Sequence, residues 1–328
     1  MEKYVPPFSI TNEILDRVVI IMKKVGKFDN YFGYNKMPLL RKNNMLLSIQ
    51  SSLAIEANSL NIDDVFKITE NNYDKYDDEV QEVMNAYEAY SMIKKIDPYS
   101  INEFKRIHGI MTNKLVRDFG KFRNGNEGVF DENGNCIHIC PPPEQVDYLM
   151  KELFKWINDS DINLLISSCV FHYEMVFIHP FSDGNGRMAR LWQNVLLTKF
   201  DRVFEYLPIE NKILEHQQEY YKVINYCDIN GDSTKFIEFM LEMINESIDD
   251  VLNKLNNVYI DSRVKKLINV MEPSVIYTTN ELLSLLKLKS RVSFRENYLL
   301  PGINSGFIKM YIPDSPTNRN QGYYINYY

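Results

Sequence analysis

Features that mark secreted, membrane-spanning and disulfide-rich proteins are missing from this sequence. Its 328 residues include only four cysteines, too few for a disulfide framework. Cys136 and Cys140 lie close together, but the second close pair that a zinc site needs is absent. The N-terminal stretch MEKYVPPFSITNEI has no apolar signal core, and no run approaches the roughly 18 uncharged apolar residues that span a membrane. We therefore expect a soluble, cytoplasmic protein with no membrane partner.

A surplus of positive charge is missing as well. The formal net charge is −7, so any contact with nucleic acid must be local. The charge is uneven, because residues 258–328 hold nine Lys and Arg against five Asp and Glu. This segment is therefore +4, which leaves −11 for residues 1–257. We expect the C-terminal segment to be a separate domain.

Helical periodicity dominates most of the chain. Apolar residues at helical spacing predict a helix that begins at Thr11 or Asn12 and ends at Gly26. The same pattern predicts further helices over 43–60, 79–96, 101–115, 144–157, 161–178, 185–200, 209–229 and 233–257. The fold is therefore expected to be mainly α.

Two segments depart from the helical pattern. In GVFDENGNCIHICPPP, 128–143, two β-prone runs flank a turn with Asn133-Gly134, which predicts a β-hairpin. Beyond 258, one or two helices (260–271 and 279–287) precede another helix and two strands joined by a polar loop. That order is typical of a winged-helix domain.

The densest cluster of reactive residues is HPFSDGNGRMAR, 179–190. An apolar helix is expected to end at Pro180, and the glycine-rich loop that follows begins a new helix near Asn185. Free backbone N–H groups at the start of a helix bind anions, and the helix dipole adds partial positive charge. Arg187 and Arg190 lie three residues apart on nearly the same face. Their guanidinium groups suit a di- or triphosphate.

The same loop offers a metal ligand and a base. Asp183 precedes the glycines, where it can hold Mg²⁺ that bridges phosphate oxygens. His179, at the other end of the loop, can take a proton from an incoming hydroxyl. These parts predict phosphoryl or nucleotidyl transfer to a hydroxyl, with a purely structural loop as the alternative. His172 is expected to be a packed core histidine, and His108 is a weak candidate.

The stretch resembles the Fic motif, HPFx(D/E)GNGRxxR, and matches it at every defined position. It is not a dinucleotide-binding fingerprint, which needs a third glycine and a preceding strand, and it is not a P-loop, which needs Gly-Lys-Ser/Thr. Similarity to the Fic family implies a Fic-type helical bundle with ATP and Mg²⁺ at the site. It also implies transfer of AMP to a Ser, Thr or Tyr hydroxyl of a target protein, with UMP or GMP left open as the transferred group.

The resemblance assigns roles to individual residues. It makes His179 the general base and Asp183 the Mg²⁺ ligand. It implies a nucleotide-binding set that consists of Gly184, Asn185, Gly186, Arg187, Arg190, Tyr220 and Tyr221. It identifies the hairpin as a flap that docks the target segment as an added strand, through Val129, Phe130, Cys136, Ile137 and His138.

An inhibitory motif lies upstream. SSLAIEAN, 51–58, resembles the family's (S/T)xxxE(G/N), which Ser52 and Glu56 match. Ala57 departs from the motif, and the asparagine follows one place later. The implied mechanism is competition, in which Glu56 pairs with Arg190 and keeps it from the γ-phosphate of ATP. Some family members also remove AMP by means of this glutamate, so de-AMPylation stays open.

The sequence thus predicts an N-terminal helical region with the inhibitory helix (1–96), a Fic catalytic core (97–257) and a winged-helix domain (258–328). A DNA-binding regulator that senses nucleotides through the Fic site is the alternative. It rests on Arg291 and Arg295, which lie four apart on one predicted helix and could contact DNA phosphates. A homodimer is also open.

Overall fold

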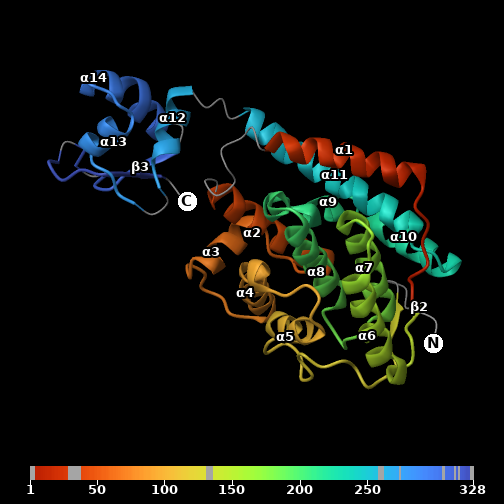
Figure 1. Cartoon of the computed structure of the whole chain (residues 1–328). Helices are drawn as coiled ribbons and strands as arrows, with labels where there is room; N and C mark the ends of the chain where they lie inside the picture. The colour runs from red at the N-terminus through yellow and green to blue at the C-terminus, as the bar shows by residue number, and fades with distance from the viewer. Residues whose placement is uncertain are drawn as a thin grey trace. The chain divides into compact units, whose positions relative to one another are not determined.

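The structure, a computed structural model, describes residues 4–28, 38–130, 136–257, 262–272, 275–304, 307–313, 315–316 and 318–325. The chain forms two compact units, the first from residues 1–25 and 43–250 and the second from 26–42 and 251–328. Helices dominate the described residues and two small antiparallel sheets accompany them, which confirms the mainly α prediction (Figure 1). Within these ranges no helix is long and apolar enough to cross a lipid bilayer. The limits of the three predicted domains stay predictions.

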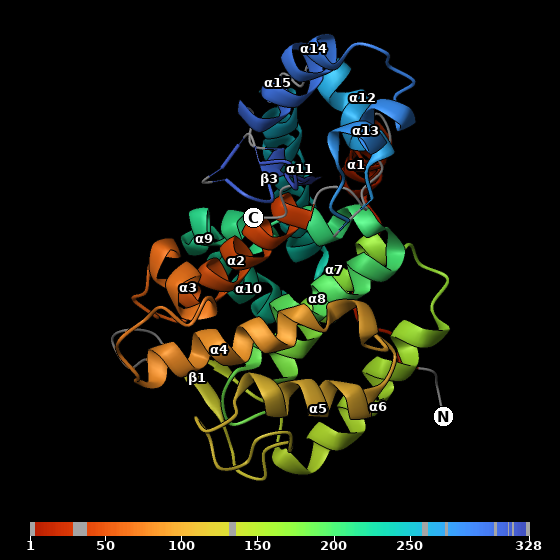
Figure 2. The same cartoon turned by 90° about the vertical axis from the view of Figure 1, so that its left-hand side faces the viewer.

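A buried pair of helices lies at the centre of the first unit. α7 (Leu164–Ile178) and α8 (Asn185–Phe200) lie side by side (Figure 1, Figure 2). Most residues of α7 are buried, so this helix is packed on all sides rather than along one stripe. The other helices are α1 (Asn12–Phe28), α2 (Pro38–Ile55), α3 (Ile62–Thr69), α4 (Asp78–Ser91), α5 (Ile101–Met111), α6 (Pro143–Asp159), α9 (Ile209–Glu215), α10 (Gln217–Asn230) and α11 (Thr234–Asn257), with short 3₁₀ helices at Ile93–Lys95 and Arg202–Tyr206.

Aromatic side chains fill the core beside the loop that joins α7 to α8. Phe104 lies edge-on to Trp192 with ring centroids 4.9 Å apart, and Phe154 and Phe171 pack around Phe104. Phe181, from the loop itself, is fully buried, and its ring centroid lies 5.3 Å from that of Phe104. The motif loop is therefore anchored in the core by one of its own side chains.

α1 packs along α11. Thr11 caps α1, since its Oγ1 accepts the N–H of Ile14 at 3.2 Å. Lys24 Nζ lies 2.6 Å from Asp249 Oδ2 and joins the two helices. The prediction that α1 ends at Gly26 is wrong, because the helix continues two residues further.

Several predicted helices end or break earlier than the periodicity suggested, and those over 79–96 and 101–115 end at Ser91 and Met111. The helix predicted over 43–60 ends at Ile55, because Ala57 has a left-handed backbone that turns the chain. The helix predicted over 209–229 is broken at His216 into α9 and α10. Apolar spacing continues through both breaks, so the periodicity did not reveal them.

The predicted β-hairpin is present. β1 (Gly128–Phe130) pairs antiparallel with β2 (Cys136–Ile139), and the register shifts between Val129 and Phe130. Residues 131–135, which include the predicted turn, lie outside the described residues. The side chains of the five predicted docking residues also lie outside what is described. The role of the hairpin as a flap stays a prediction.

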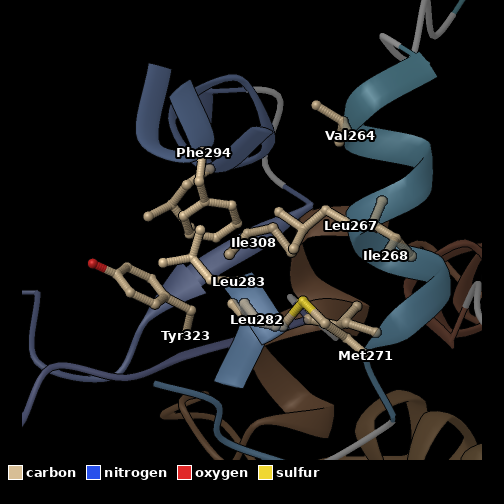
Figure 3. Packing of buried hydrophobic residues seen from close by; sticks show 11 residues of the cluster. Val264, Leu267, Ile268, Met271, Leu282, Leu283, Phe294, Ile308 and Tyr323 are labelled. Carbon is tan, nitrogen blue, oxygen red and sulfur yellow. The ribbon is translucent and has the colours of Figure 1, made fainter. Parts of the chain in front are cut away.

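The second unit has its own hydrophobic core. Leu267, Phe294 and Ile308 meet at its centre (Figure 3). An isolated bridge joins Tyr277 to Tyr323. The elements follow the predicted order of helices and then two strands: α12 (Ser262–Val270), α13 (Thr279–Leu285), α14 (Arg291–Phe294), a π-helical turn (Arg295–Leu299), α15 (Leu300–Asn304), and the antiparallel pair β3 (Ile308–Met310) and β4 (Tyr323–Ile325).

Candidate active site

The motif loop leaves α7 and enters α8 through two left-handed residues. His179, the C-terminal cap of α7, has φ 51° and ψ 61°, and its N–H donates to the Met175 carbonyl at 3.0 Å. Gly184, the N-terminal cap of α8, has φ 77°, and a Cβ there would lie 3.0 Å from a methyl of Thr112. Both the backbone angle and the space therefore favour glycine. The predicted base and the predicted phosphate-binding helix start lie at opposite ends of one short loop.

Asn185 fastens this loop with its side chain. Its Oδ1 accepts the N–H of Phe181 at 2.9 Å, and its Nδ2 donates to the Phe181 carbonyl at 2.8 Å. The side chain is buried, so its polar atoms serve the loop. Asn185 is also the first residue of α8, where the N–H groups have no partner within the helix. Its predicted contact with a nucleotide therefore rests on the backbone N–H.

His108 supports the loop, although the sequence marked it only as a weak candidate. Its Nδ1 accepts the N–H of Gly120 at 2.9 Å, so Nε2 carries the proton and donates to the Asp183 carbonyl at 3.0 Å. The ring stacks on Phe181 with a centroid distance of 3.6 Å. Burial lowers the pKa of His108 to about 4, so the ring is neutral at pH 7 and keeps this tautomer. His108 thereby positions the backbone of Asp183.

Arg123 ties the loop to both sides of the hairpin. Its Nε donates to the His179 carbonyl at 2.7 Å, its Nη1 to the Gly125 carbonyl at 2.7 Å and its Nη2 to the Pro141 carbonyl at 2.5 Å. Gly125 precedes β1 and Pro141 follows β2. One buried guanidinium therefore holds the backbone of the predicted base and the two ends of the hairpin together. Arg123 could not be identified from the sequence, because an isolated arginine that binds carbonyls belongs to no motif.

The first motif arginine lies between two carboxylates. Arg187 Nη2 lies 2.7 Å from Asp183 Oδ2, and Nη1 lies 3.0 Å from Oε1 of Glu82 on α4. The Arg187 side chain is 4% exposed. Its Nε is buried and has no hydrogen-bond partner in the described part of the chain. Because an unpaired buried donor is costly, Arg187 has a donor that an anionic ligand would satisfy.

The second motif arginine is held by the predicted inhibitory segment. Arg190 Nε donates to Ser52 Oγ at 2.9 Å, and Nη2 donates to the Ser52 carbonyl at 3.0 Å and to Glu56 Oε1 at 2.7 Å. The Arg190 side chain is 1% exposed, whereas that of Glu56 is 37% exposed. Burial lowers the pKa of Arg190 and the Glu56 carboxylate raises it, and the net shift is upward. Arg190 is therefore charged and paired with the predicted glutamate.

Glu56 occupies the space beside the glycine loop. A Cβ on Gly186 would overlap the Glu56 carboxylate, so this carboxylate lies against the backbone at the start of α8. Glu56 follows the last residue of α2, and Ala57 has φ 69° in a turn closed by the Asn58 N–H and the Leu53 carbonyl at 3.1 Å. Glycine and asparagine adopt this backbone readily, while alanine does so at a cost of about 1 kcal/mol. The position at which the sequence departs from the inhibitory motif is thus a left-handed one.

The two tyrosines of the predicted nucleotide-binding set differ in accessibility. Tyr220 is 2% exposed, and its hydroxyl lies 3.0 Å from Nε2 of His172. Tyr221 is 44% exposed and donates to the Ile55 carbonyl at 3.3 Å. His172 is itself buried, and burial lowers its pKa to about 3, as suits a packed core histidine. Tyr221 is therefore the more accessible of the two for the predicted contact with a nucleotide, because Tyr220 belongs to the core.

Asp183 fits a metal ion that arrives with a nucleotide. Its side chain is 49% exposed at the tip of the loop. Mg²⁺ is commonly bound through one or two carboxylates together with substrate phosphates and water. No group of three or more His, Cys, Asp or Glu that could hold a metal occurs among the described residues. The donor set is thus suited to Mg²⁺ shared with phosphates rather than to a metal held by protein ligands alone.

Three carboxylates meet two guanidiniums at this site. Asp183 and Glu82 contact Arg187, and Glu56 contacts Arg190. The positive charge that would attract a polyphosphate is therefore more than balanced in this state. A phosphate ligand must displace a carboxylate, or bring its own cation, before both arginines can hold it.

Family profiles and a solved structure are similar to this chain. A profile of the Fic/DOC family matches residues 98–197. A second profile, described as the C-terminal domain of "Filamentation induced by cAMP protein Fic-like" proteins, matches residues 262–326. The crystal structure of a Fic family protein from Desulfovibrio desulfuricans G20 is 33% identical with a TM-score of 0.74, and the match covers 98% of each chain.

Curated relatives are similar over part of their length. Protein adenylyltransferase Fic of Nematostella vectensis is 28% identical over 170 residues, which is 51% of this chain and 37% of that protein. The protein of the same name from Drosophila melanogaster is 28% identical over 215 residues, which is 61% of this chain and 41% of that protein. The match thus spans about two fifths of these relatives. On the match to the Desulfovibrio structure along nearly its whole length, this chain belongs to the Fic family.

Proposed function

We propose that this protein transfers AMP from ATP to a Ser, Thr or Tyr hydroxyl of a target protein, with Mg²⁺ bound beside the nucleotide. The observation that carries the proposal is a core-anchored loop with His179 at one end and the start of α8 at the other, backed by Arg187 and Arg190. A histidine beside a phosphate-binding helix start suits attack of a hydroxyl on phosphorus. The name of the curated relatives, protein adenylyltransferase, supports the same reaction.

In the proposed reaction, His179 takes the proton of the target hydroxyl as its oxygen attacks the α-phosphorus. The bond from that phosphorus to the bridging oxygen breaks, AMP stays on the target and pyrophosphate leaves. The N–H groups at the start of α8 and the guanidiniums of Arg187 and Arg190 hold the phosphates and offset the charge of the leaving group. Mg²⁺ held by Asp183 would supply further positive charge to the phosphates. The hairpin would dock the target segment as an added strand.

Autoinhibition by Glu56 is part of the proposal. The carboxylate of Glu56 bonds to Arg190 and lies against Gly186, where an outer phosphate would have to approach the helix start. Arg190 can hold a γ-phosphate only after Glu56 has left it. Until then a bound nucleotide is displaced from the productive pose, and a shift of about 1 Å can lower a rate about 100-fold.

Mass spectrometry of the purified protein after incubation with ATP and Mg²⁺ tests both parts of this proposal. Glu56→Gly is expected to gain the mass of AMP on its own chain, and the parent is expected to gain much less. If Glu56→Gly gained no such mass, on itself or on proteins of a cell lysate, AMP transfer would be wrong. Equal modification of parent and variant would refute the inhibition alone. Release of free AMP from a modified chain by the parent and Mg²⁺ would reveal de-AMPylation, in which water replaces the target hydroxyl on the phosphorus.

The second unit is proposed to be a winged-helix domain, because its helices precede a β-hairpin and Tyr277 bridges to Tyr323. DNA binding is a second candidate function for it, since Arg291 and Arg295 are both exposed and lie one turn apart. Binding of a labelled duplex by the full chain at low salt, weakened by Arg291→Ala with Arg295→Ala, would support this function. DNA binding that is unchanged by both substitutions would exclude a contact through Arg291 and Arg295.

A further inference from the structure

Glu82, on α4, joins the phosphate site to the inhibitory segment, and neither the Fic motif nor the inhibitory motif includes it. Its Oε1 lies 3.0 Å from Arg187 Nη1, and its Oε2 accepts a hydrogen bond from Asn58 Nδ2 at 2.8 Å. Each oxygen of one carboxylate therefore serves a different partner. The Glu82 side chain is 23% exposed, so these bonds are partly shielded from water.

Asn58 connects this carboxylate to Glu56. Only Ala57 separates the two residues, and the turn is closed by the Asn58 N–H and the Leu53 carbonyl. The Asn58 side chain is 8% exposed, and its Oδ1 accepts the N–H of Leu60 at 3.0 Å. A movement that withdraws Glu56 together with this turn must therefore strain or break the bond between Asn58 and Glu82.

Glu79 provides a matched comparison on the same helix. It lies one turn before Glu82 and holds the same segment, accepting from the N–H of Ser59 at 2.7 Å and from its hydroxyl at 2.9 Å. Glu79 and Glu82 thus carry the same charge and fasten the same turn to α4. They differ in that Glu82 also contacts Arg187.

We propose that Glu82 is a positioning residue of the phosphate site. It releases Arg187 when a phosphate ligand binds that arginine, and the loss of this contact acts through Asn58 on the turn that carries Glu56. The proposal rests on the proposed function, in which the ligand is the triphosphate of a nucleotide. When a phosphate takes Arg187, Glu82 loses one of its two partners and its hold on Asn58 loosens. Glu56 can then leave Arg190, so the two motif arginines become available together.

Binding of inorganic triphosphate to the full chain tests this without any need for catalysis. Glu82→Gln keeps the size of the side chain but removes its charge and one of its two acceptor oxygens. We expect it to bind triphosphate about tenfold more tightly than the parent, the change that about 1.4 kcal/mol of binding free energy produces. Glu79→Gln, which removes the same charge, is expected to stay within about twofold of the parent. Thermal unfolding of all three proteins shows whether any difference comes from misfolding.

Hydrogen exchange of a peptide that covers 53–60 tests the transmission. Triphosphate is expected to raise exchange there in the parent and to have little effect in Asn58→Ala, where the link to Glu82 is cut. Equal binding by Glu82→Gln and Glu79→Gln, or an equal exchange response in the parent and Asn58→Ala, would overturn the proposal. AMP labelling by Glu56→Gly in the same preparations separates the two ideas. If Glu56→Gly becomes labelled but Glu82→Gln binds triphosphate no more tightly than the parent, only the role of Glu82 is refuted. If Glu82→Gln binds more tightly but Glu56→Gly is not labelled, only AMP transfer is refuted.

Discussion

Replacement of Arg123 by alanine removes three short hydrogen bonds at once, to the carbonyls of His179, Gly125 and Pro141. A bond between a charged donor and a buried acceptor is worth about 1.5 kcal/mol. The free energy of unfolding should therefore fall by about 4.5 kcal/mol. Activity should fall as well, because the left-handed backbone of His179 loses the bond that holds its carbonyl. In a Glu56→Gly background we expect kcat to drop about tenfold or more with the KM for ATP unchanged.

Urea denaturation and steady-state kinetics measure the two effects. Arg106→Ala is a matched control, since Arg106 is 42% exposed and pairs with Glu103 on its own helix. It should cost no more than about 0.5 kcal/mol. Arg123→Lys keeps the charge on a single nitrogen and should fall between the parent and Arg123→Ala. The reasoning is refuted if Arg123→Ala unfolds within about 1 kcal/mol of the parent, or if the substitution raises the KM for ATP and leaves kcat intact.

Four further substitutions follow from the structure. Ala57→Gly removes a left-handed alanine, so urea denaturation should show that the free energy of unfolding rises by up to about 1 kcal/mol. The variant should also show less background labelling than the parent. Burial raises the pKa of Glu174 from 4.5 to about 7. Because the folded protein holds a proton on Glu174 more tightly than the unfolded chain does, this proton stabilises the fold fully below pH 4.5, and the stabilisation is lost as the pH rises to about 7. The free energy of unfolding should fall by about 3 kcal/mol over that range. Denaturation of Glu174→Gln across the same range should show no such fall. Tyr221→Ala should weaken ATP binding about tenfold, whereas Tyr220→Phe should lower stability and leave nucleotide affinity unchanged.

The motif loop could be predicted from the sequence because its functional groups are contiguous. Glycines, an aspartate and two arginines within twelve positions define a helix start and the face on which Arg187 and Arg190 lie. The pair of Glu56 and Arg190 could also be predicted across 134 positions, since the inhibitory segment has a pattern of its own. The contact is present, and its inhibitory effect stays a prediction.

Glu82, His108 and Arg123 could not be assigned in the same way. Each forms hydrogen bonds to a backbone carbonyl or a side chain that is distant in the sequence and is brought near by tertiary packing. No spacing in the sequence predicts such a contact. A single Glu on a helix or a single Arg in a loop is more often solvated, so composition favours the wrong interpretation of Glu82 and Arg123. The adjacent tyrosines illustrate the same difficulty, because the sequence gives no sign that Tyr220 is buried while Tyr221 is half-exposed.

Helix existence was predictable and helix ends were less so. Apolar spacing identified the long helices, because their buried faces repeat over several turns. It carried the helix over 43–60 past Ile55, because the turn at Ala57 depends on a backbone angle that alanine seldom adopts. That misplaced end matters for function, since it puts Glu56 in a turn rather than within a helix.

Labelling of a cell lysate with α-³²P-ATP and Mg²⁺ tests together whether the protein transfers AMP through His179 and whether Glu56 inhibits that transfer. Three proteins are compared: the parent, Glu56→Gly, and Glu56→Gly combined with His179→Ala. We expect strong labelling of target protein by Glu56→Gly, little by the parent and none by the double variant. Label that survives loss of His179, or parent labelling as strong as that of Glu56→Gly, would contradict this expectation.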